Sequence, residues 1–478
     1  MKRFIAIFLI IIICLSLTSC DYNITSIESL MRPPKLSGER SLLQQAFEQS
    51  IKDTAGVIMK TPVSGNYRSS FLFYDLDKDG VQEALVFYSN PMVDVMAYVN
   101  VFKQVDGEWK IISKIKGKNE EIYEINFADI NGDNISEILI SWTGAVVSDK
   151  SNTSDFGIIN ERLLSVYSCD GVTTTLLKTE TYSNMFLEDL NNDGSDEIVI
   201  FKIVLADNEK QTTSRIIVFN NDFTIKSDEK LSLTGMLEIN NITTDNIEID
   251  DKKHTRIFVD GAISEIGVIT EIIDIENESF DVSLPLYETN QSQKPLTLRA
   301  SRTYCNDIDN DGVIEIPTDE VLPFGYRITE NSNQQNELYM TVWSEFVDSA
   351  LLVDFKCLMN NSFNYMFVFP DDILSTMSSV YNDNNCTLTF YSVDGNDQLV
   401  DELFSIKAFY EPDWDNNHNR YVRFAENSTY VYGYLILNEE NDENYEEFIS
   451  GTKKCIEVCS NLGIKNLVVP SGYEKGIS

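Results

Sequence analysis

A short acidic motif recurs along the chain, and this repeat constrains the fold more than any other feature. Four copies read DLDKDGVQE, DINGDNISE, DLNNDGSDE and DIDNDGVIE, beginning at Asp75, Asp129, Asp189 and Asp307. The starts are 54, 60 and 118 residues apart, so the last spacing is about twice the others. A degenerate copy, without the glycine and the regular acidic spacing, is expected at 237–251. The chain is therefore predicted to contain five units of similar length.

The residues around each motif predict four antiparallel strands per unit. Apolar runs such as ALVF and IVIF follow the acidic loop, and alternating segments such as YVNVFKQVDGEWKIIS come later. Asp106-Gly107 and Asp170-Gly171 are dipeptides typical of tight hairpins. Four antiparallel strands repeated every 54–60 residues are typical of a β-propeller blade. The predicted fold is mainly β: a propeller of about five four-stranded blades, with five to seven allowed.

The acidic loops themselves carry oxygen ligands at regular positions. Positions 1, 3 and 5 are Asp or Asn, position 9 is always Glu, and position 7 offers a backbone carbonyl. The predicted metal ligands are Asp75, Asp77, Asp79, Val81, Glu83, Asp129, Asn131, Asp133, Ile135, Glu137, Asp189, Asn191, Asp193, Ser195, Glu197, Asp307, Asp309, Asp311, Val313 and Glu315. Carboxylates and one carbonyl around a small circle suit a hard cation such as calcium. The simpler alternative is a set of solvated turns without metal.

An EF-hand is a second alternative, and the residues after the loop argue against it. An EF-hand needs a bidentate Glu at position 12 on a following helix. Position 12 is apolar or Thr here, and the segment that follows is strand-like. Position 6 is Gly80, Gly194 or Gly312, and Asn134 in the second copy, which predicts positive φ at this point. Position 2 is always apolar, so we expect it to anchor the loop to a core.

Over residues 37–360 the pattern resembles the FG-GAP/VCBS repeat family, the calcium-loop blades of integrin α-subunit propellers and of many bacterial surface proteins. The resemblance implies structural Ca²⁺ in the loops and a fourth blade without an ion. The FG and GAP elements themselves are not clearly present, so close kinship with integrins is not implied.

The first 36 residues predict export and a membrane anchor. Lys2 and Arg3 precede a short apolar run that ends in Leu17-Thr18-Ser19-Cys20. This arrangement is typical of a signal peptide over 1–19 and resembles a bacterial lipobox, which implies cleavage before Cys20 and lipid attachment to its sulfur. An ordinary signal peptide is the alternative. Residues 20–36 are expected to form a tether, and 37–53 a helix that packs on the propeller.

Residues 361–478 are predicted to form a separate α+β domain. Several strands precede one amphipathic helix over 442–463. Tyr430, Tyr432 and Tyr434 share one face of a strand, where they either pack under a helix or form a binding platform. The polar loop at 411–420, which contains Trp414, is the second candidate contact surface.

Charge and composition restrict the function. The formal net charge of −39 excludes nucleic acid as a favourable partner. The six cysteines after Cys20 are too widely spaced for a small disulfide framework, and we expect buried thiols. The two histidines, His254 and His418, lie in no recognisable nucleophile or metalloprotease motif. We therefore predict no catalytic residue, and a non-catalytic, lipid-anchored calcium-binding protein outside the bacterial cytoplasmic membrane that contacts a protein or glycan. The alternative is an extracellular polysaccharide-acting enzyme that uses a carboxylate pair.

Overall fold

The structure, a computed structural model, is built almost entirely of antiparallel strands. It describes residues 38–468 except 52–55, 144–160, 191–193, 206–211, 221, 235, 250–251, 265–266, 277–278, 284–285, 288–293, 310, 330–334, 349, 361, 364, 370–373, 375–376, 427–428 and 438–466. The predicted signal peptide, the tether, the helix at 442–463, Cys455 and Cys459 lie outside these residues. Within the described part, no helix has both the length and the apolar character that crossing a membrane requires.

Three sheets follow one another in the first half of the chain, and each is a meander of four sequential strands. The first contains β2 (Phe71–Tyr74), β3 (Glu83–Asn90), β4 (Asp94–Val105) and β5 (Glu108–Lys116), with β1 (Ile58–Met59) also on β3. The second contains β6 (Ile122–Ala128), β7 (Glu137–Trp142), β8 (Arg162–Cys169) and β9 (Thr174–Tyr182). The third contains β10 (Asn184–Glu188), β11 (Glu197–Leu205), β12 (Thr212–Phe219) and β13 (Ile225–Thr234). The predicted four-stranded unit is confirmed.

The fourth sheet has the same topology without an acidic loop. It contains β14 (Glu238–Ile249), β15 (Lys252–Ser264), β16 (Gly267–Glu276) and β17 (Ser279–Ser283). The segment expected to be a degenerate loop is strand β14 itself. It pairs with β15 from Glu238↔Ala262 to Ile249↔Lys252, so a hairpin joins the two strands directly. A short pair, β18 (Leu286–Tyr287) and β19 (Lys294–Pro295), precedes the next unit.

The last sheet has ten strands and combines the fifth unit with the C-terminal region. Its strands are β20 (Glu315–Ile328), β21 (Gln335–Val347), β22 (Ala350–Asn360), β23 (Tyr365–Phe369), β24 (Met377–Asn382), β25 (Thr387–Val393), β26 (Leu399–Tyr410), β27 (Val422–Glu426), β28 (Tyr430–Ile436) and β29 (Leu467–Val468). A 3-10 turn, η2 (Glu411–Asp413), and a one-turn helix, α4 (Trp414–Asn417), follow β26. Hydrogen bonding crosses the predicted boundary at 360/361, because β22 pairs with β23 and β20 with β24. The division into two domains stays a prediction.

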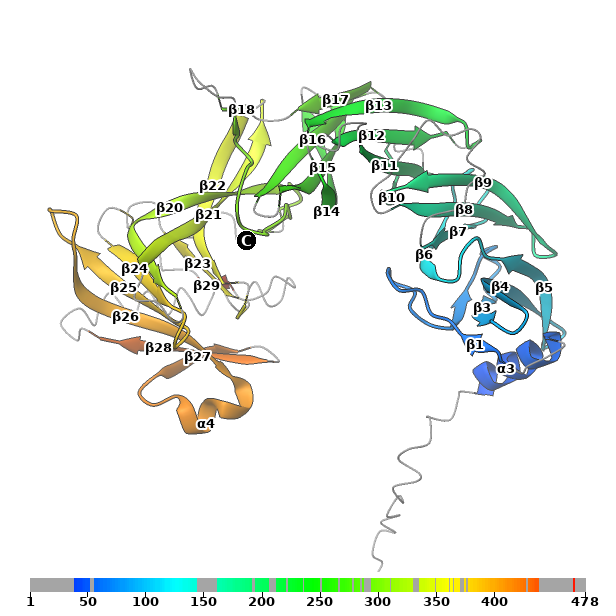
Figure 1. Ribbon diagram of the computed structural model, residues 1–478, viewed down its shortest axis with the longest axis horizontal. Helices are drawn as coiled ribbons and strands as arrows, with labels where there is room; N and C mark the ends of the chain where they lie inside the picture. The colour runs from blue at the N-terminus through cyan, green and yellow to red at the C-terminus, as the bar shows by residue number, and fades with distance from the viewer. Residues whose placement is uncertain are drawn as a thin grey trace, which may run out of the picture.

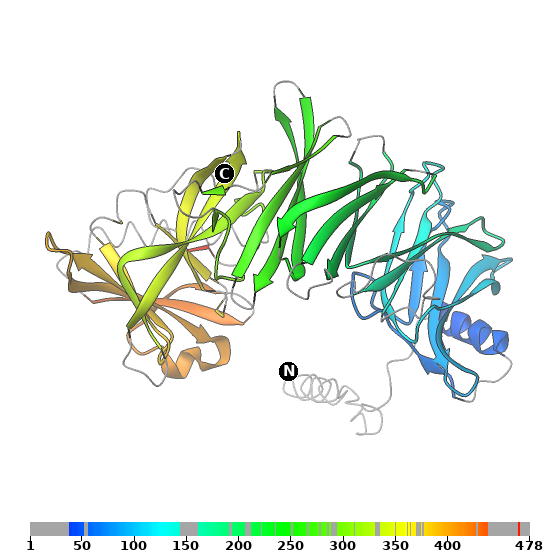
Figure 2. The same cartoon turned by 45° about the horizontal axis from the view of Figure 1, so that its top comes forward.

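The sheets succeed one another along an open arc. Figures 1 and 2 both show the first sheet at one end and the ten-stranded sheet at the other. The sheets do not meet in a ring in either view, and closure into a propeller and the number of blades stay predictions. In the fifth unit, the first strand is reduced to an isolated bridge between Asn306 and Glu315, and β24 pairs parallel with β20 instead. Strands of the C-terminal region therefore extend the sheet of the fifth unit, where a closed ring would instead place the first unit.

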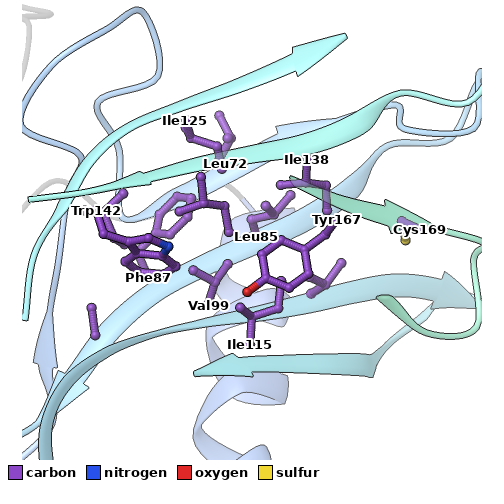
Figure 3. Packing of buried hydrophobic residues seen from close by; sticks show 14 of the residues in the cluster. Leu72, Leu85, Phe87, Val99, Ile115, Ile125, Ile138, Trp142, Tyr167 and Cys169 are labelled. Carbon is purple, nitrogen blue, oxygen red and sulfur yellow. The ribbon is translucent and has the colours of Figure 1, made fainter. Parts of the chain in front are cut away.

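The core lies between consecutive sheets. Leu85 and Phe87 of β3 pack with Ile138 and Trp142 of β7 between the first two sheets (Figure 3). Strands β3 and β7 are buried at every residue, because each is covered on both faces. This explains why these segments read as continuous apolar runs rather than as alternating ones. Similar clusters join each later sheet to the next.

A helix covers the outer face of the first sheet. The predicted helix at 37–53 is confirmed as α3 (Gly38–Ser50). Leu43 and Phe47 are buried against Val86 and Tyr88 of β3. Leu42, the residue before Leu43, is 54% exposed. Because the first sheet has no preceding unit, α3 provides the cover that a neighbouring sheet provides elsewhere.

Candidate metal centres and a lined cleft

Each acidic loop joins a strand to the next one through the same set of hydrogen bonds. The carboxylate at position 1 accepts the N–H of position 6, at 3.0 Å for Asp75 and 3.1 Å for Asp307. Position 6 has positive φ in all four loops, including Asn134, as predicted. The apolar residue at position 2 is buried or partly buried in every loop. The described residues of the loops therefore form anchored turns, as their composition predicted.

The constant Glu at position 9 has a structural role of its own. One oxygen of Glu83, Glu137, Glu197 and Glu315 accepts the N–H of position 2 in its own loop, at 2.8–3.0 Å. All four glutamates are almost completely buried. This hydrogen bond closes the loop and by itself requires a long carboxylate side chain. The recurrence of Glu thus has a second explanation besides metal ligation.

Further backbone hydrogen bonds occupy one oxygen of the other acids. In the first loop, Asp77 Oδ1 accepts from the Asp79 N–H at 3.3 Å, and Asp79 Oδ1 accepts from Val81 at 2.7 Å. In the fourth loop, Asp309 and Asp311 repeat this pattern at 3.1 and 2.8 Å. The backbone therefore holds the side chains in place while a second oxygen of each stays available.

Three of the loop oxygens are buried and have no hydrogen-bond partner, namely Asp75 Oδ1, Glu83 Oε1 and Asp307 Oδ1. Buried polar atoms without a partner are uncommon in folded proteins and often mark an ion or water site. The carboxylates of Asp75, Asp77 and Glu83 lie within 4.8 Å of one another, and so do those of Asp307, Asp309 and Asp311. Both groups could hold a metal ion.

The pKa values of several of these acids are raised, which means that the fold disfavours their ionised forms. Burial, aided by neighbouring carboxylates, raises the pKa of Glu315 to about 8 and that of Glu137 to about 7. Burial and the nearby Asp311 raise the pKa of Asp309 to about 6. A bound cation would stabilise the ionised form of each group, which the metal-free loop disfavours.

The other two loops differ in what the structure describes. In the second loop, the Asn131 side-chain N–H donates to Glu137 Oε1 at 2.9 Å, so this glutamate already has a partner for each oxygen. In the third loop, Asn191 and Asp193 lie outside the described residues. The carbonyl ligands predicted at position 7 stay predictions in all four loops.

A basic side chain that the sequence analysis missed lies in the first loop. Lys103 of β4 forms ion pairs with Asp77 at 2.6 Å, Glu83 at 3.3 Å and Asp79 at 3.5 Å. Burial tends to raise the pKa of Asp77, but the hydrogen bond from Lys103, with further contributions, lowers it overall. Burial raises the pKa of Glu83. The nine-residue motif DLDKDGVQE does not indicate this lysine, because Lys103 lies outside the motif, in strand β4.

The loops also connect neighbouring units. The Ser136 N–H in the second loop donates to the Leu76 carbonyl in the first at 2.8 Å. The Ile314 N–H in the fourth loop donates to Asp245 of β14 at 3.0 Å. Asp245 also forms a buried ion pair with Arg256 of β15. In the first unit, the acidic loop accepts a hydrogen bond from the loop of the next unit. In the fourth unit, which has no acidic loop, the Asp245–Arg256 ion pair accepts the corresponding hydrogen bond.

A cleft of about 800 Å³ lies in the ten-stranded sheet. Its lining combines aromatic rings with polar groups, including Tyr339, Phe363, Tyr381, Asn360, Glu337 and the ion pair of Arg327 with Asp383. Tyr339 is half exposed, and its hydroxyl donates to Glu337 at 2.6 Å. Arg327 lies over the ring of Tyr381. No sequence motif pointed to this cleft, because its residues come from six strands and three connecting segments.

The two C-terminal contact surfaces considered from the sequence are mostly packed. Tyr432 is completely buried in a core cluster, and Tyr430 and Tyr434 pack against that cluster. The tyrosines therefore pack within the sheet's core cluster, whereas the helix expected to cover them lies outside the described residues. Trp414 stacks on His418 at 4.7 Å and meets the edge of Phe409 at 5.1 Å, so its ring is engaged within its own region.

The four cysteines that the structure describes give no sign of a disulfide framework. Cys169, Cys305 and Cys357 are buried free thiols, which confirms that expectation for these three. Cys305 lies in a fully buried network with Asp260 and Arg299, whose ion pair measures 2.8 Å.

Comparisons with known proteins identify no family. No family model matches the chain, and no curated protein matches its sequence. Among solved structures, exotype rhamnogalacturonan lyase YesX is 12% identical over 72% of this chain and 73% of its own, with a TM-score of 0.29. Sqt1 of Saccharomyces cerevisiae is 11% identical over 79% and 86%, also with a TM-score of 0.29. Endo-arabinase of Bacteroides thetaiotaomicron is 11% identical over 59% and 96%, with a TM-score of 0.22. Likeness at this level supports no conclusion about function.

Proposed function

We propose that the chain is a non-catalytic, calcium-stabilised β-sheet scaffold, lipid-anchored outside the bacterial cytoplasmic membrane, that presents a surface to a protein or glycan. The observation that carries the calcium part is the geometry of the fourth loop. Three carboxylates converge there, one oxygen of Asp307 is buried without a hydrogen bond, and the nearby Glu315 is held in an environment that disfavours its charge.

Calcium fits these loops better than other common cations. The donors are all oxygens, which excludes a preference for zinc or copper. Turns built from Asp and Gly hold several carboxylates close together without a rigid octahedral arrangement, which favours Ca²⁺ over Mg²⁺. The role expected for the ion is structural, since it would neutralise repelling carboxylates and hold adjacent strands together.

Thermal unfolding of the full chain tests the calcium proposal. With a dissociation constant of about 10⁻⁴–10⁻³ M, 10 mM Ca²⁺ should add roughly 1.4–2.7 kcal/mol per site over EDTA. Asp309→Asn should reduce this gain, whereas Asp415→Asn, an exposed control in α4, should retain it. An unchanged midpoint between EDTA and 10 mM Ca²⁺ in the wild type would remove the calcium part of the proposal.

The cleft is the surface we assign to ligand contact. The half-exposed ring of Tyr339, next to amide, hydroxyl and carboxylate groups, is suited to the apolar face and hydroxyl groups of a sugar. The Arg327–Asp383 pair cancels its own charge, so the cleft does not select for an anion. These features support a neutral glycan rather than a phosphorylated ligand.

Binding and turnover on the same glycans separate this proposal from the enzymatic alternative. Tyr339→Ala should weaken binding of any retained glycan, while Tyr410→Ala, another exposed tyrosine, should not. Reproducible cleavage of a glycan, lost in Glu337→Gln, would favour a polysaccharide-acting enzyme instead.

The membrane anchor rests on the N-terminal sequence alone. Cys20→Ser should abolish incorporation of labelled fatty acid and release the protein from the membrane fraction. Retention of the label in this variant would refute lipidation at Cys20.

A further inference from the structure

We propose that Lys103 acts as a built-in counter-ion that takes the place of a divalent cation in the first loop. The fourth loop, whose carboxylates pair with no lysine or arginine among the described residues, is then the one that depends on calcium. This inference rests on the proposed calcium-binding function. It assigns different roles to two loops that the sequence motif presents as equivalent.

The lysine ammonium contacts the oxygens that the loop backbone leaves available. Asp77 Oδ1, Asp79 Oδ1 and Glu83 Oε2 accept backbone N–H groups. Lys103 Nζ approaches the other oxygen of each: Asp77 Oδ2 at 2.6 Å, Glu83 Oε1 at 3.3 Å and Asp79 Oδ2 at 3.5 Å. Asp77 and Glu83 belong, with Asp75, to the group of carboxylates in this loop that could hold a metal ion. One ammonium and one metal ion therefore compete for the same position.

Strand register explains how Lys103 reaches the loop. Strand β4 runs antiparallel to β3, and Ala84 pairs with Phe102. The next position along each strand brings Lys103 opposite Glu83, on the face where the loop closes. The lysine is therefore held by the sheet itself and needs no change of the loop to reach the carboxylates.

The same register position has a different residue in every unit. Continuation of the strand pairing by one residue places Ser168 opposite Glu137 and Asn220 opposite Glu197. In the fifth unit, Glu345 pairs directly with Glu315. In the fifth unit, which contains the fourth loop, a carboxylate therefore occupies the strand position that an ammonium occupies in the first unit.

The surroundings of the fourth loop increase its need for a cation. Asp354 lies close enough to Glu345 and Asp311 for their charges to act on it. Among the residues that the structure describes, no lysine or arginine forms an ion pair with Asp307, Asp309, Asp311 or Glu315. Negative charge accumulates at this loop without an internal counter-ion, which favours a divalent cation from solution.

Reciprocal substitutions in the full chain test the inference, with unfolding midpoints measured in EDTA and in 10 mM Ca²⁺. Lys103→Gln should lower the midpoint in EDTA and enlarge the gain on adding Ca²⁺ to about twice that of the wild type, because a second loop becomes available. Glu345→Lys should raise the midpoint in EDTA and reduce the gain. Lys118→Gln, which removes an exposed lysine in a turn, is the matched control and should resemble the wild type.

Calcium titration by calorimetry adds a readout that does not depend on stability. Lys103→Gln should bind one more Ca²⁺ than the wild type, and Asp77→Asn in that background should remove it. The inference is overturned if Lys103→Gln behaves like Lys118→Gln in EDTA, or if it gains no calcium response beyond the wild type. If the wild type and Glu345→Lys both lack any response, the calcium proposal fails separately, and the midpoint of Lys103→Gln in EDTA alone decides the counter-ion role.

Discussion

Individual carboxylates in these loops have two separable tasks. In the fourth loop, one oxygen of Asp307 and one of Glu315 fix the turn by accepting a backbone N–H, and the other oxygen of Asp307 is buried without a hydrogen bond. The glutamate at position 9 would be required by the first task even without a metal ion. The evidence for an ion in the fourth loop is therefore the partnerless second oxygen of Asp307, rather than the recurrence of acidic residues.

Protonation of Glu315 gives the metal-free protein a defined pH dependence. Its pKa is about 8 in the fold, above the ordinary value of about 4.5, so the native state holds its proton more tightly than the unfolded chain. The stability that this proton contributes is fully present below about pH 4.5 and is lost as the pH rises towards 8. Glu137 and Asp309 shift in the same direction. In EDTA, we expect a higher unfolding midpoint at pH 6 than at pH 8.

Glu315→Gln is the control for this pH dependence, because glutamine can accept the same backbone hydrogen bond without a titration. The difference between the midpoints at pH 6 and pH 8 should shrink in this variant. With calcium, the trend should reverse, since metal binding requires deprotonated carboxylates and weakens as the pH falls. A metal-free midpoint that increases steadily from pH 6 to pH 8 would contradict the assignment.

At the scale of elements, burial on two faces is the common property of the central strands. Residues on one face of β3 pack towards the second sheet and those on the other towards α3. Helix α3 therefore covers one face of the first sheet, in the way that a neighbouring sheet covers the faces of the later sheets. Without α3, the first sheet would expose an apolar face to solvent.

Adjacent leucines in α3 provide a matched test of this packing. Leu43 is completely buried, whereas Leu42 is 54% exposed. Leu43→Ala should lower the free energy of unfolding by about 2–5 kcal/mol, because it leaves a cavity against β3. Leu42→Ala should change it by less than about 0.5 kcal/mol. Equal effects in chemical denaturation would show that the helix does not pack as described.

At the scale of the molecule, hydrogen bonds link consecutive units. They involve the acidic loops and, in the fourth unit, the Asp245–Arg256 ion pair. Ser136 donates to Leu76 between the first two units, and Arg256 donates to the Phe346 carbonyl between the fourth and fifth at 2.6 Å. Each contact is between neighbours in the series. Such contacts stabilise an arc or a ring equally well, so they do not by themselves bring the ends together.

The open arc predicts a larger radius of gyration than a closed, compact fold of the same length. A compact chain of this size has a radius of gyration of about 23 Å. Small-angle X-ray scattering of the protein without residues 1–37 should give a clearly higher value. A radius near 23 Å would instead indicate that the series of sheets closes in solution.

The four-stranded unit and the acidic loop that forms the candidate site could be predicted from the sequence. The acidic loop, its positive φ at position 6, its buried residue at position 2 and the strand after position 9 all follow from local chemistry. The roles of Lys103 and Glu345 could not be predicted, because each reaches its loop through pairing between strands. The cleft escaped prediction for the same reason, since Arg327 and Asp383 are 56 residues apart.

By itself, the sequence determined that the chain forms repeated antiparallel units joined by carboxylate-rich turns, because turn chemistry and strand periodicity act over a few residues. The tertiary structure decided which loops have an internal counter-ion, how the sheets succeed one another and where a cleft forms. These depend on register and on contacts between distant strands, whose geometry is set by packing of whole sheets. The loop DLDKDGVQE is thus specified locally, but the cation that neutralises it is chosen by the strand across from it.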